Sequence, residues 1–174
     1  ELRCQIEKVL SDNLQVTHID SHQHIHILPF VNQLVIKLCN EYNINKMRIP
    51  KEAYFFQGGF SAGLGRRIGR AGLTFFAQMA QLSASEKKIL YPDNFFGMLA
   101  GGNLNTALVG NILQKLPDGV SELMTHPGLD NHALSQNFSW QYHWQDELDA
   151  YLNQDNKNLL RKKEITLINF GGLD

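Results

Sequence analysis

The sequence lacks most of the features that would place it in a specialised class of protein. Only two of its 174 residues are cysteines, Cys4 and Cys39, and they form no CxxC pair, so neither a disulfide framework nor a thiolate metal site is indicated. We expect both to be small buried apolar residues. No apolar run approaches the roughly 18 residues of a membrane-spanning helix. The sixteen Lys and Arg are balanced by seventeen Asp and Glu, which argues against a polybasic chain that binds nucleic acid.

Motifs of two large enzyme classes are also missing. No serine stands in the GxSxG elbow of α/β-hydrolases. The glycines at positions 63, 65 and 69 miss the dinucleotide-binding fingerprint by one residue and follow no clear strand, so a phosphate-binding loop is disfavoured. We interpret the arginines among and after these glycines as a solvated face; they are Arg66, Arg67 and Arg70.

The sequence does contain the composition and periodicity of a globular α/β domain. Hydrophobic residues make up 43% of the chain, and segments of helical period alternate with extended ones, as in crossover units around a largely parallel sheet. We predict strands over 16–20, 47–49, 120–125 and 165–170, and an extended or irregular segment over 89–98. Helices are predicted over 2–10, 29–42, 73–81, 104–116 and 144–152, with a loop or lid over 60–72. No linker or repeat divides the chain, so we predict one domain spanning residues 1–174.

The most informative segment is rich in histidine. Four of the seven histidines and one aspartate fall at every second position between residues 17 and 26. In an extended backbone, alternate side chains project to the same face, so these five could point together. They are His18, Asp20, His22, His24 and His26.

Imidazole nitrogens bind divalent transition metals such as zinc, and a carboxylate can orient a ligand histidine. We therefore predict that at least one of His22, His24 and His26 binds a divalent ion, Mg or Zn. Asp20 is expected in the catalytic site, either as a direct ligand or as the group that orients one. We expect His18, earlier in the strand, to be structural. The alternative is that these are ordinary hydrogen-bonded residues at a strand end.

A second candidate stands in the segment Ser121 to Gly128, where a predicted strand runs into a His-Pro-Gly turn. Pro and Gly end the strand and leave His126 at its carboxyl end, the edge where parallel α/β sheets collect catalytic groups. Because imidazole titrates near neutral pH, His126 could act as a general acid. The alternative is a histidine that only caps the turn.

Two further positions are candidates for substrate binding. Arg48 stands two residues before Pro50 and could bind a polar substrate group, although a buried ion pair with a strand neighbour is an equal alternative. Asp93 and Asn94 could line a pocket with the nearby aromatic residues, on which sugar rings stack. For that segment we favour a loop with buried Phe side chains.

These motifs resemble those of a known family. The segments THIDSHQHIHILP, EYNINKMRIPKE and SELMTHPG are similar to the YdjC-like carbohydrate deacetylases, which include chitooligosaccharide deacetylases and related hopanoid-biosynthesis enzymes. The resemblance implies a (β/α) barrel and a divalent metal held by one Asp and two His. His22 matches one of those ligands, and His126 matches the catalytic-site histidine of the HPG motif. Because the family's Asp-Asp-Phe-Gly and His-x-x-Leu-like motifs are not in this chain, we expect the C-terminal two-thirds of a member, a partial barrel without the N-terminal strands.

The resemblance also implies an activity. The complete enzyme would hydrolyse the N-acetyl group of an amino sugar or oligosaccharide, with metal-activated water as the nucleophile and His126 protonating the departing amine. We expect residues 1–174 alone to be inactive and to bind metal weakly, because the ligand set is incomplete.

Two other interpretations stay open. One is an amidohydrolase-type barrel with Asp20-x-His22-x-His24 as its ligand motif. The other is a non-catalytic metal- or carbohydrate-binding module. For partners, we expect a carbohydrate substrate, no nucleic acid and no membrane span, and a homodimer stays open. The predicted location is cytoplasmic.

Overall fold

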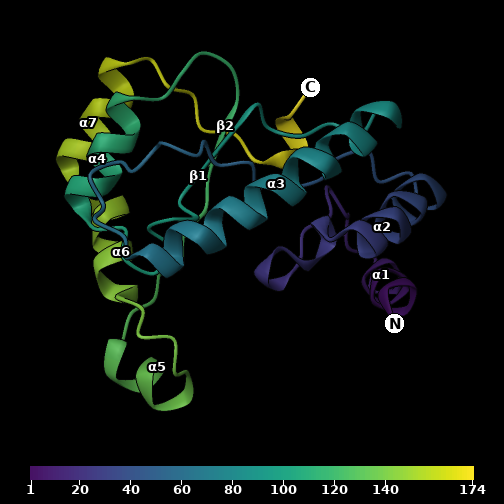
Figure 1. Ribbon diagram of the computed structural model, residues 1–174, viewed down its shortest axis with the longest axis horizontal. Helices are drawn as coiled ribbons and strands as arrows, with labels where there is room; N and C mark the ends of the chain where they lie inside the picture. Colours follow the sequence, from purple (N-terminus) through teal and green to yellow (C-terminus); the bar gives the residue numbers. More distant parts are fainter. The chain divides into compact units, whose positions relative to one another are not determined.

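Helices make up most of the chain, and two short strands form its one sheet (Figure 1). The computed structural model describes residues 1–174 and separates them into two units. The first unit comprises residues 1–51, 72–93 and 168–174, and the second comprises residues 52–71 and 94–167. The single domain predicted for residues 1–174 stays a prediction. None of the helices has both the length and the apolar character needed to cross a membrane.

The first unit is built on parallel pairing between three extended segments. Ile19 pairs with Met47, and Lys46 pairs with Leu90, each through an isolated parallel bridge. The helices of this unit are α1 (Leu2–Ser11), the 3₁₀ helix η1 (His22–Ile27), α2 (Pro29–Glu41), most of α3 (Leu64–Glu86) and η2 (Phe170–Gly172). Its core is formed by buried side chains of η1, α2, α3 and the paired segments, including Ile27, Val35, Cys39, Met47, Ala77 and Ile89.

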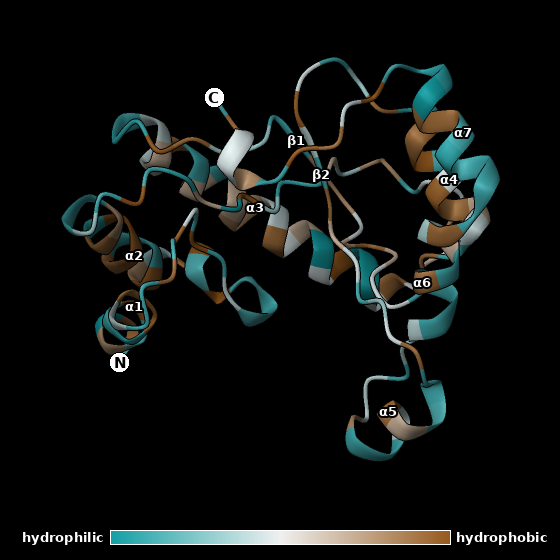
Figure 2. Cartoon of the chain, turned by 180° about the vertical axis from the view of Figure 1, so that it is seen from behind, coloured by the Kyte–Doolittle hydropathy of each residue, from teal (hydrophilic) through white to brown (hydrophobic).

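The second unit holds the sheet and a group of packed helices. Strands β1 (Asn94–Phe96) and β2 (Ser121–Leu123) are parallel, with Asn94 opposite Ser121. Helix α4 (Thr106–Gln114) lies beside α6 (Trp144–Leu152) and α7 (Gln154–Lys162), and α5 (Asn131–Asn137) lies beyond α6 (Figure 1). Figure 2 shows that α4, α6 and α7 each carry hydrophobic and hydrophilic sides. The apolar sides meet in a core that includes Phe96, Leu104, Val109, Ile112 and Ala150.

The α/β class is confirmed as a mixed arrangement, with shorter strands than predicted. The segments around residues 19, 47 and 90 pair through single bridges only, and 165–170 forms no strand and leads into η2. Helices α5 and α7 were not predicted. Each begins at a side-chain cap that periodicity does not reveal: Asp130 accepts from Ala133 N–H, and Asn153 accepts from two backbone N–H groups of α7.

The loop or lid predicted over 60–72 is wrong from residue 64 onward, where α3 begins and runs unbroken to Glu86. Glycine disfavours a helix by only about 1 kcal/mol, and tertiary contacts can outweigh that cost. Here Arg70 is 6% exposed and donates hydrogen bonds to the carbonyls of Tyr54 and Phe56. The prediction of a solvated face is therefore wrong for Arg70, although Arg66 and Arg67 are exposed.

The two cysteines also differ from each other. Cys39 is buried, as predicted, whereas Cys4 is exposed. Helix α1, which carries Cys4, has no buried residue at all. This helix contacts α2 through a surface ion pair between Arg3 and Glu41. The prediction that Cys4 is buried is therefore wrong.

Candidate functional site

The histidine-rich segment does not continue as the extended backbone on which its alternation was interpreted. The chain turns at Ser21 into η1, where the N–H of His24 donates to the Ser21 carbonyl at 3.1 Å. Gln23 and His24 both have left-handed backbone angles, with φ of 52° and 59°. The side chains of the histidines therefore do not share one face. His22 is exposed, whereas His24 and His26 are buried.

Asp20, Ser21, His26 and Arg48 form a local polar network. The Asp20 carboxylate accepts from Ser21 N–H at 2.6 Å and forms an ion pair with the Arg48 guanidinium. Its Oδ1 also lies 3.8 Å from Nδ1 of His26. Arg48 thus forms an ion pair, as the alternative left open from the sequence required, but the two side chains are 20% and 28% exposed and not buried. The substrate-binding role of Arg48 stays a prediction.

His26 lies in the centre of this network with both ring nitrogens in contact with the protein. Nε2 lies 2.8 Å from the carbonyl oxygen of Arg48, which can only accept, so Nε2 carries the proton. Nδ1 then accepts from the Ser21 hydroxyl at 2.7 Å, and that same hydroxyl accepts from His26 N–H at 2.9 Å. Burial lowers the pKa of His26, more than the Arg48 carbonyl and Asp20 raise it. His26 therefore acts here as a neutral structural residue with no ring nitrogen left for a metal.

The remaining ligand candidates are His22 and His24. The ring of His24 lies beside that of His26, with 6.3 Å between ring centres. Consecutive left-handed residues other than glycine store backbone strain, on the order of 1–3 kcal/mol each, and such strain concentrates at functional sites. Nevertheless, no group of three or more His, Cys, Asp or Glu side chains is arranged to hold a metal ion. The residues of this chain do not make a complete metal centre by themselves.

His126 lies in the second unit, in the segment that follows β2, and it faces a buried carboxylate. Its Nδ1 lies 3.8 Å from Oε2 of Glu147, a side chain with no exposed surface. Nδ1 itself is buried, yet 29% of the His126 side chain is exposed. Nδ1 is therefore not the ring nitrogen that a substrate reaches. The ring of Tyr142 packs edge-on against the imidazole, with 4.8 Å between centres.

Glu147 fixes the turn that carries His126. It accepts from His126 N–H at 2.5 Å, from the Thr125 hydroxyl at 3.0 Å and from Leu104 N–H at 3.1 Å. Burial raises the pKa of Glu147, but the contacts with His126, Leu104 and Thr125 outweigh burial and hold the pKa below its ordinary value. Glu147 is therefore an anion beside His126. It is placed to orient the ring and to stabilise its protonated form.

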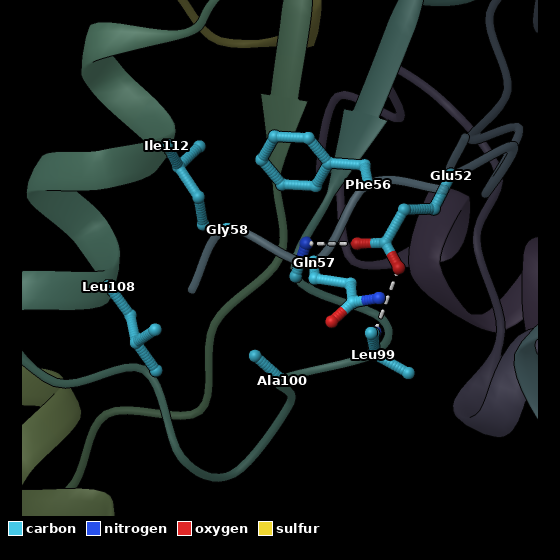
Figure 3. A pocket seen from close by; sticks show the side chains of 9 residues that line it. Glu52, Phe56, Gln57, Gly58, Leu99, Ala100, Leu108 and Ile112 are labelled. Atoms are coloured by element: carbon cyan, nitrogen blue, oxygen red, sulfur yellow. Dashed lines mark hydrogen bonds between the residues drawn. The ribbon is translucent and has the colours of Figure 1, made fainter. Parts of the chain in front are cut away.

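A second buried glutamate, Glu52, binds the backbone that follows β1. Glu52 is 2% exposed and accepts from the N–H groups of Gly97, Met98 and Leu99, at 2.8, 3.1 and 2.9 Å, directly after β1. Its Oε2 lies 3.8 Å from the buried Arg70 guanidinium. Figure 3 shows this carboxylate at the wall of a small cavity, with Phe56, Leu108 and Ile112 around it. Both strands thus end in a turn that a buried carboxylate holds in place.

The predicted site residues are divided between the units. Asp20, the histidines of residues 18–26, Arg48 and Asp93 belong to the first unit, and His126 belongs to the second. Within the first unit, His18 stacks on Phe170 with 3.8 Å between ring centres. Phe95 and Phe96 are buried, as favoured from the sequence, but they lie in β1 and not in a loop. Asp93 is exposed, and its substrate-binding role stays a prediction.

Sequence reasoning missed Glu52 and Glu147. For Glu147 a signal was present, because it falls on the apolar face of α6 between Trp144 and Ala150, both buried. A carboxylate on the buried face of a helix requires partners, which the sequence does not identify.

Comparison with known proteins places these features in a family. The family model described as YdjC-like protein matches residues 1–162. The chain belongs to the YdjC-like family. Its relatives include a carbohydrate deacetylase of Brevibacillus brevis, 26% identical over 99% of this chain and 60% of the relative, and one of Clostridium beijerinckii, 30% identical over 98% and 58%. The chain thus spans about three-fifths of the length of these curated relatives.

A solved structure shares the fold of this YdjC-like chain. It is a candidate cellobiose-phosphate cleavage protein of Enterococcus faecalis strain V583, with a TM-score of 0.65 and 18% sequence identity. The match covers 95% of this chain and 56% of that protein. At this level of identity the likeness concerns the fold alone.

Proposed function

We propose that the full-length protein is a carbohydrate deacetylase that hydrolyses the N-acetyl amide of an amino sugar or a short oligosaccharide of amino sugars. The observation that carries this proposal is the His126–Glu147 pair at the end of β2, in a chain of the YdjC-like family. Several relatives are named carbohydrate deacetylases, which supports the assignment. The barrel and metal dependence implied by the family resemblance are part of this proposal.

His126 carries the proton transfer in this proposal. Amide hydrolysis requires a proton on the departing nitrogen, because a neutral amine leaves far more readily than an amide anion. Nε2 of His126 is the donor, and the Glu147 carboxylate keeps Nδ1 oriented and stabilises the imidazolium before the transfer. After the transfer the imidazole is neutral, and the nitrogen departs as a neutral amine.

The proposed metal, Mg or Zn, would be held in part by His22 and by His24 or Asp20, with further ligands from outside this set. A bound divalent cation polarises an amide carbonyl and lowers the pKa of water toward about 7. The residues of this chain position the proposed ligand His22, because the Asp20–Arg48–His26 network fixes the start of η1, where His22 lies. The amidohydrolase alternative has less support, because η1 removes the shared face that Asp20-x-His22-x-His24 would need.

Two substitutions in the full-length protein test the proposal. Acetate release from N-acetylglucosamine and its β-1,4-linked oligomers should fall about 100-fold or more in H126A, whereas bound divalent metal stays at the wild-type level. In H22A, both bound metal and acetate release should fall. His132 is an exposed histidine of α5, and H132A provides the matched control with unchanged activity. Wild-type rates in H126A would refute the assignment, and so would an H126A variant that loses its metal. The homodimer and the cytoplasmic location stay predictions.

A further inference from the structure

A groove of about 680 Å³ opens in the second unit. Its size lies within the range of small-molecule binding sites, roughly 300–1,000 Å³. The wall combines aromatic rings with side-chain amides and includes Phe60, Trp140, Tyr142, Asn103, Asn131 and Gln141. None of these residues was singled out in the sequence, and none takes part in the proton transfer assigned to His126.

A row of aromatic rings leads along this region. Phe138, Trp140, Tyr142 and Trp144 stand at every second position, and each ring packs on the next, with 4.9, 5.7 and 5.8 Å between successive centres. The row is most accessible at Trp140 and Phe138, which are 44% and 42% exposed, and it is closed at Trp144, which is 5% exposed. Accessible aromatic faces next to a groove are typical of surfaces on which flat ligands stack.

The row is connected to His126 through Tyr142, whose ring contacts both the imidazole and Trp140. The Tyr142 ring packs closely on the backbone at Gly102, because a Cβ atom at that position would collide with it, and Gly102 has a φ of 79°. Only glycine fits that position without displacing Tyr142. Tyr142 therefore links the wall of the groove to the residue to which the proton transfer is assigned.

The polar part of the wall favours a neutral ligand. Its side-chain amides can each donate and accept hydrogen bonds, as sugar hydroxyls require. Arg66 is the one arginine of the wall, and its guanidinium is already used by the fold. It donates to the carbonyls of Leu99 and Gly101, at 3.0 and 3.3 Å, and lies over the Phe60 ring. The wall has no lysine and no carboxylate, and its one other basic side chain is that of His143, so amides and hydroxyls supply most of its hydrogen-bonding groups.

We propose that this groove is a binding subsite for a neutral oligosaccharide, with Trp140 as the platform for a sugar ring next to the one that reacts near His126. The inference rests on the proposed function and extends it, because it makes a chain of at least two sugars the preferred substrate. An N-acetylated monosaccharide that reacts near His126 would gain nothing from Trp140.

The test compares ligand length in the full-length protein. The probes are N-acetylglucosamine and its β-1,4-linked trimer, with binding measured by calorimetry in an H126Q background so that the probe is not consumed. W140A should weaken trimer binding about tenfold, equivalent to about 1.4 kcal/mol, and change monomer binding less than twofold. W140F keeps an aromatic face and should restore most of the affinity. The control is F55A, which removes a 95% exposed ring that does not line the groove.

Kinetics separate this inference from the proposed function. With His126 intact, W140A should raise KM for the trimer about tenfold and leave kcat unchanged. Equal trimer affinity in W140A and wild type, or an equal loss in F55A, would overturn the subsite even if acetate release is normal. If trimer binding depends on Trp140 but the wild type releases no acetate, the subsite stands and the proposed deacetylase activity falls.

Discussion

Replacing Glu147 with Gln tests the central contact of the second unit without changing the size of the side chain. The wild-type carboxylate only accepts hydrogen bonds, and three donors point at it, from Leu104, Thr125 and His126. Gln has one oxygen and one NH₂ group. Whichever way the amide is turned, at least one buried donor faces another donor.

The size of the effect follows from that mismatch. The better orientation keeps the amide oxygen near Thr125 and His126 and leaves the Leu104 N–H opposite the NH₂ group. A buried donor without a partner costs about 1–3 kcal/mol, and hydrogen bonds to a charged acceptor are stronger than those to a neutral one. We therefore expect E147Q to lower the free energy of unfolding by about 2–3 kcal/mol, and E147A to lower it further.

Urea unfolding of the full-length protein measures this change as a lower midpoint at constant slope. The matched control is D146N, one residue earlier on α6 and exposed, where only a helix-dipole effect of about 0.3–1 kcal/mol is lost. If E147Q unfolds at the wild-type urea concentration, or no earlier than D146N, the argument for a structural anion at this position is wrong.

The pH dependence gives an independent check. Because the pKa of Glu147 is lowered in the folded protein, its stabilising effect is present above the ordinary glutamate pKa of 4.5 and is lost as pH falls through the lower folded value. The difference in stability between wild type and E147Q should therefore be full at pH 7 and shrink below pH 4.5. In the catalytic assay, E147Q should lower kcat for acetate release, because the imidazole loses the anion that orients it. A kcat unchanged in E147Q would separate Glu147 from the function of His126.

Two further predictions concern residues that the structure placed differently from the sequence. R70M should lower the free energy of unfolding by about 3–5 kcal/mol in urea, because it leaves the buried Glu52 without its cation. The control is R67M, at an exposed arginine of the same helix, which should cost less than about 1 kcal/mol. Similar values for both variants would refute the buried ion pair. Burial raises the pKa of the Cys39 thiol to about 11, so a thiol reagent at pH 8 should label only the exposed Cys4 in the folded protein and both cysteines after denaturation, as counted by mass spectrometry.

Features set by neighbouring residues were predictable from the sequence. The stripe 31, 34, 35, 38 and 42 indicated a helix, found over Pro29–Glu41, and Pro127 with Gly128 marked the end of the strand before His126. The His-rich segment was not predictable in the same way. Its turn depends on the Ser21 hydroxyl and on the Arg48 carbonyl, 22 residues from His26, and an alternating pattern contains no information about such partners.

The two buried glutamates show why the sequence predicted only part of the candidate site. A strand end and a His-Pro-Gly turn identify the position of a candidate catalytic residue, but they do not fix the conformation of the turn. Glu52 and Glu147 do so from outside the strands, each by binding the backbone that follows one strand of the sheet. The desolvation cost of such carboxylates is offset only when several donors converge on them. Since Glu147 also faces the imidazole, one buried charge both orders the turn and orients His126, and a substitution there should affect stability and the rate of acetate release together.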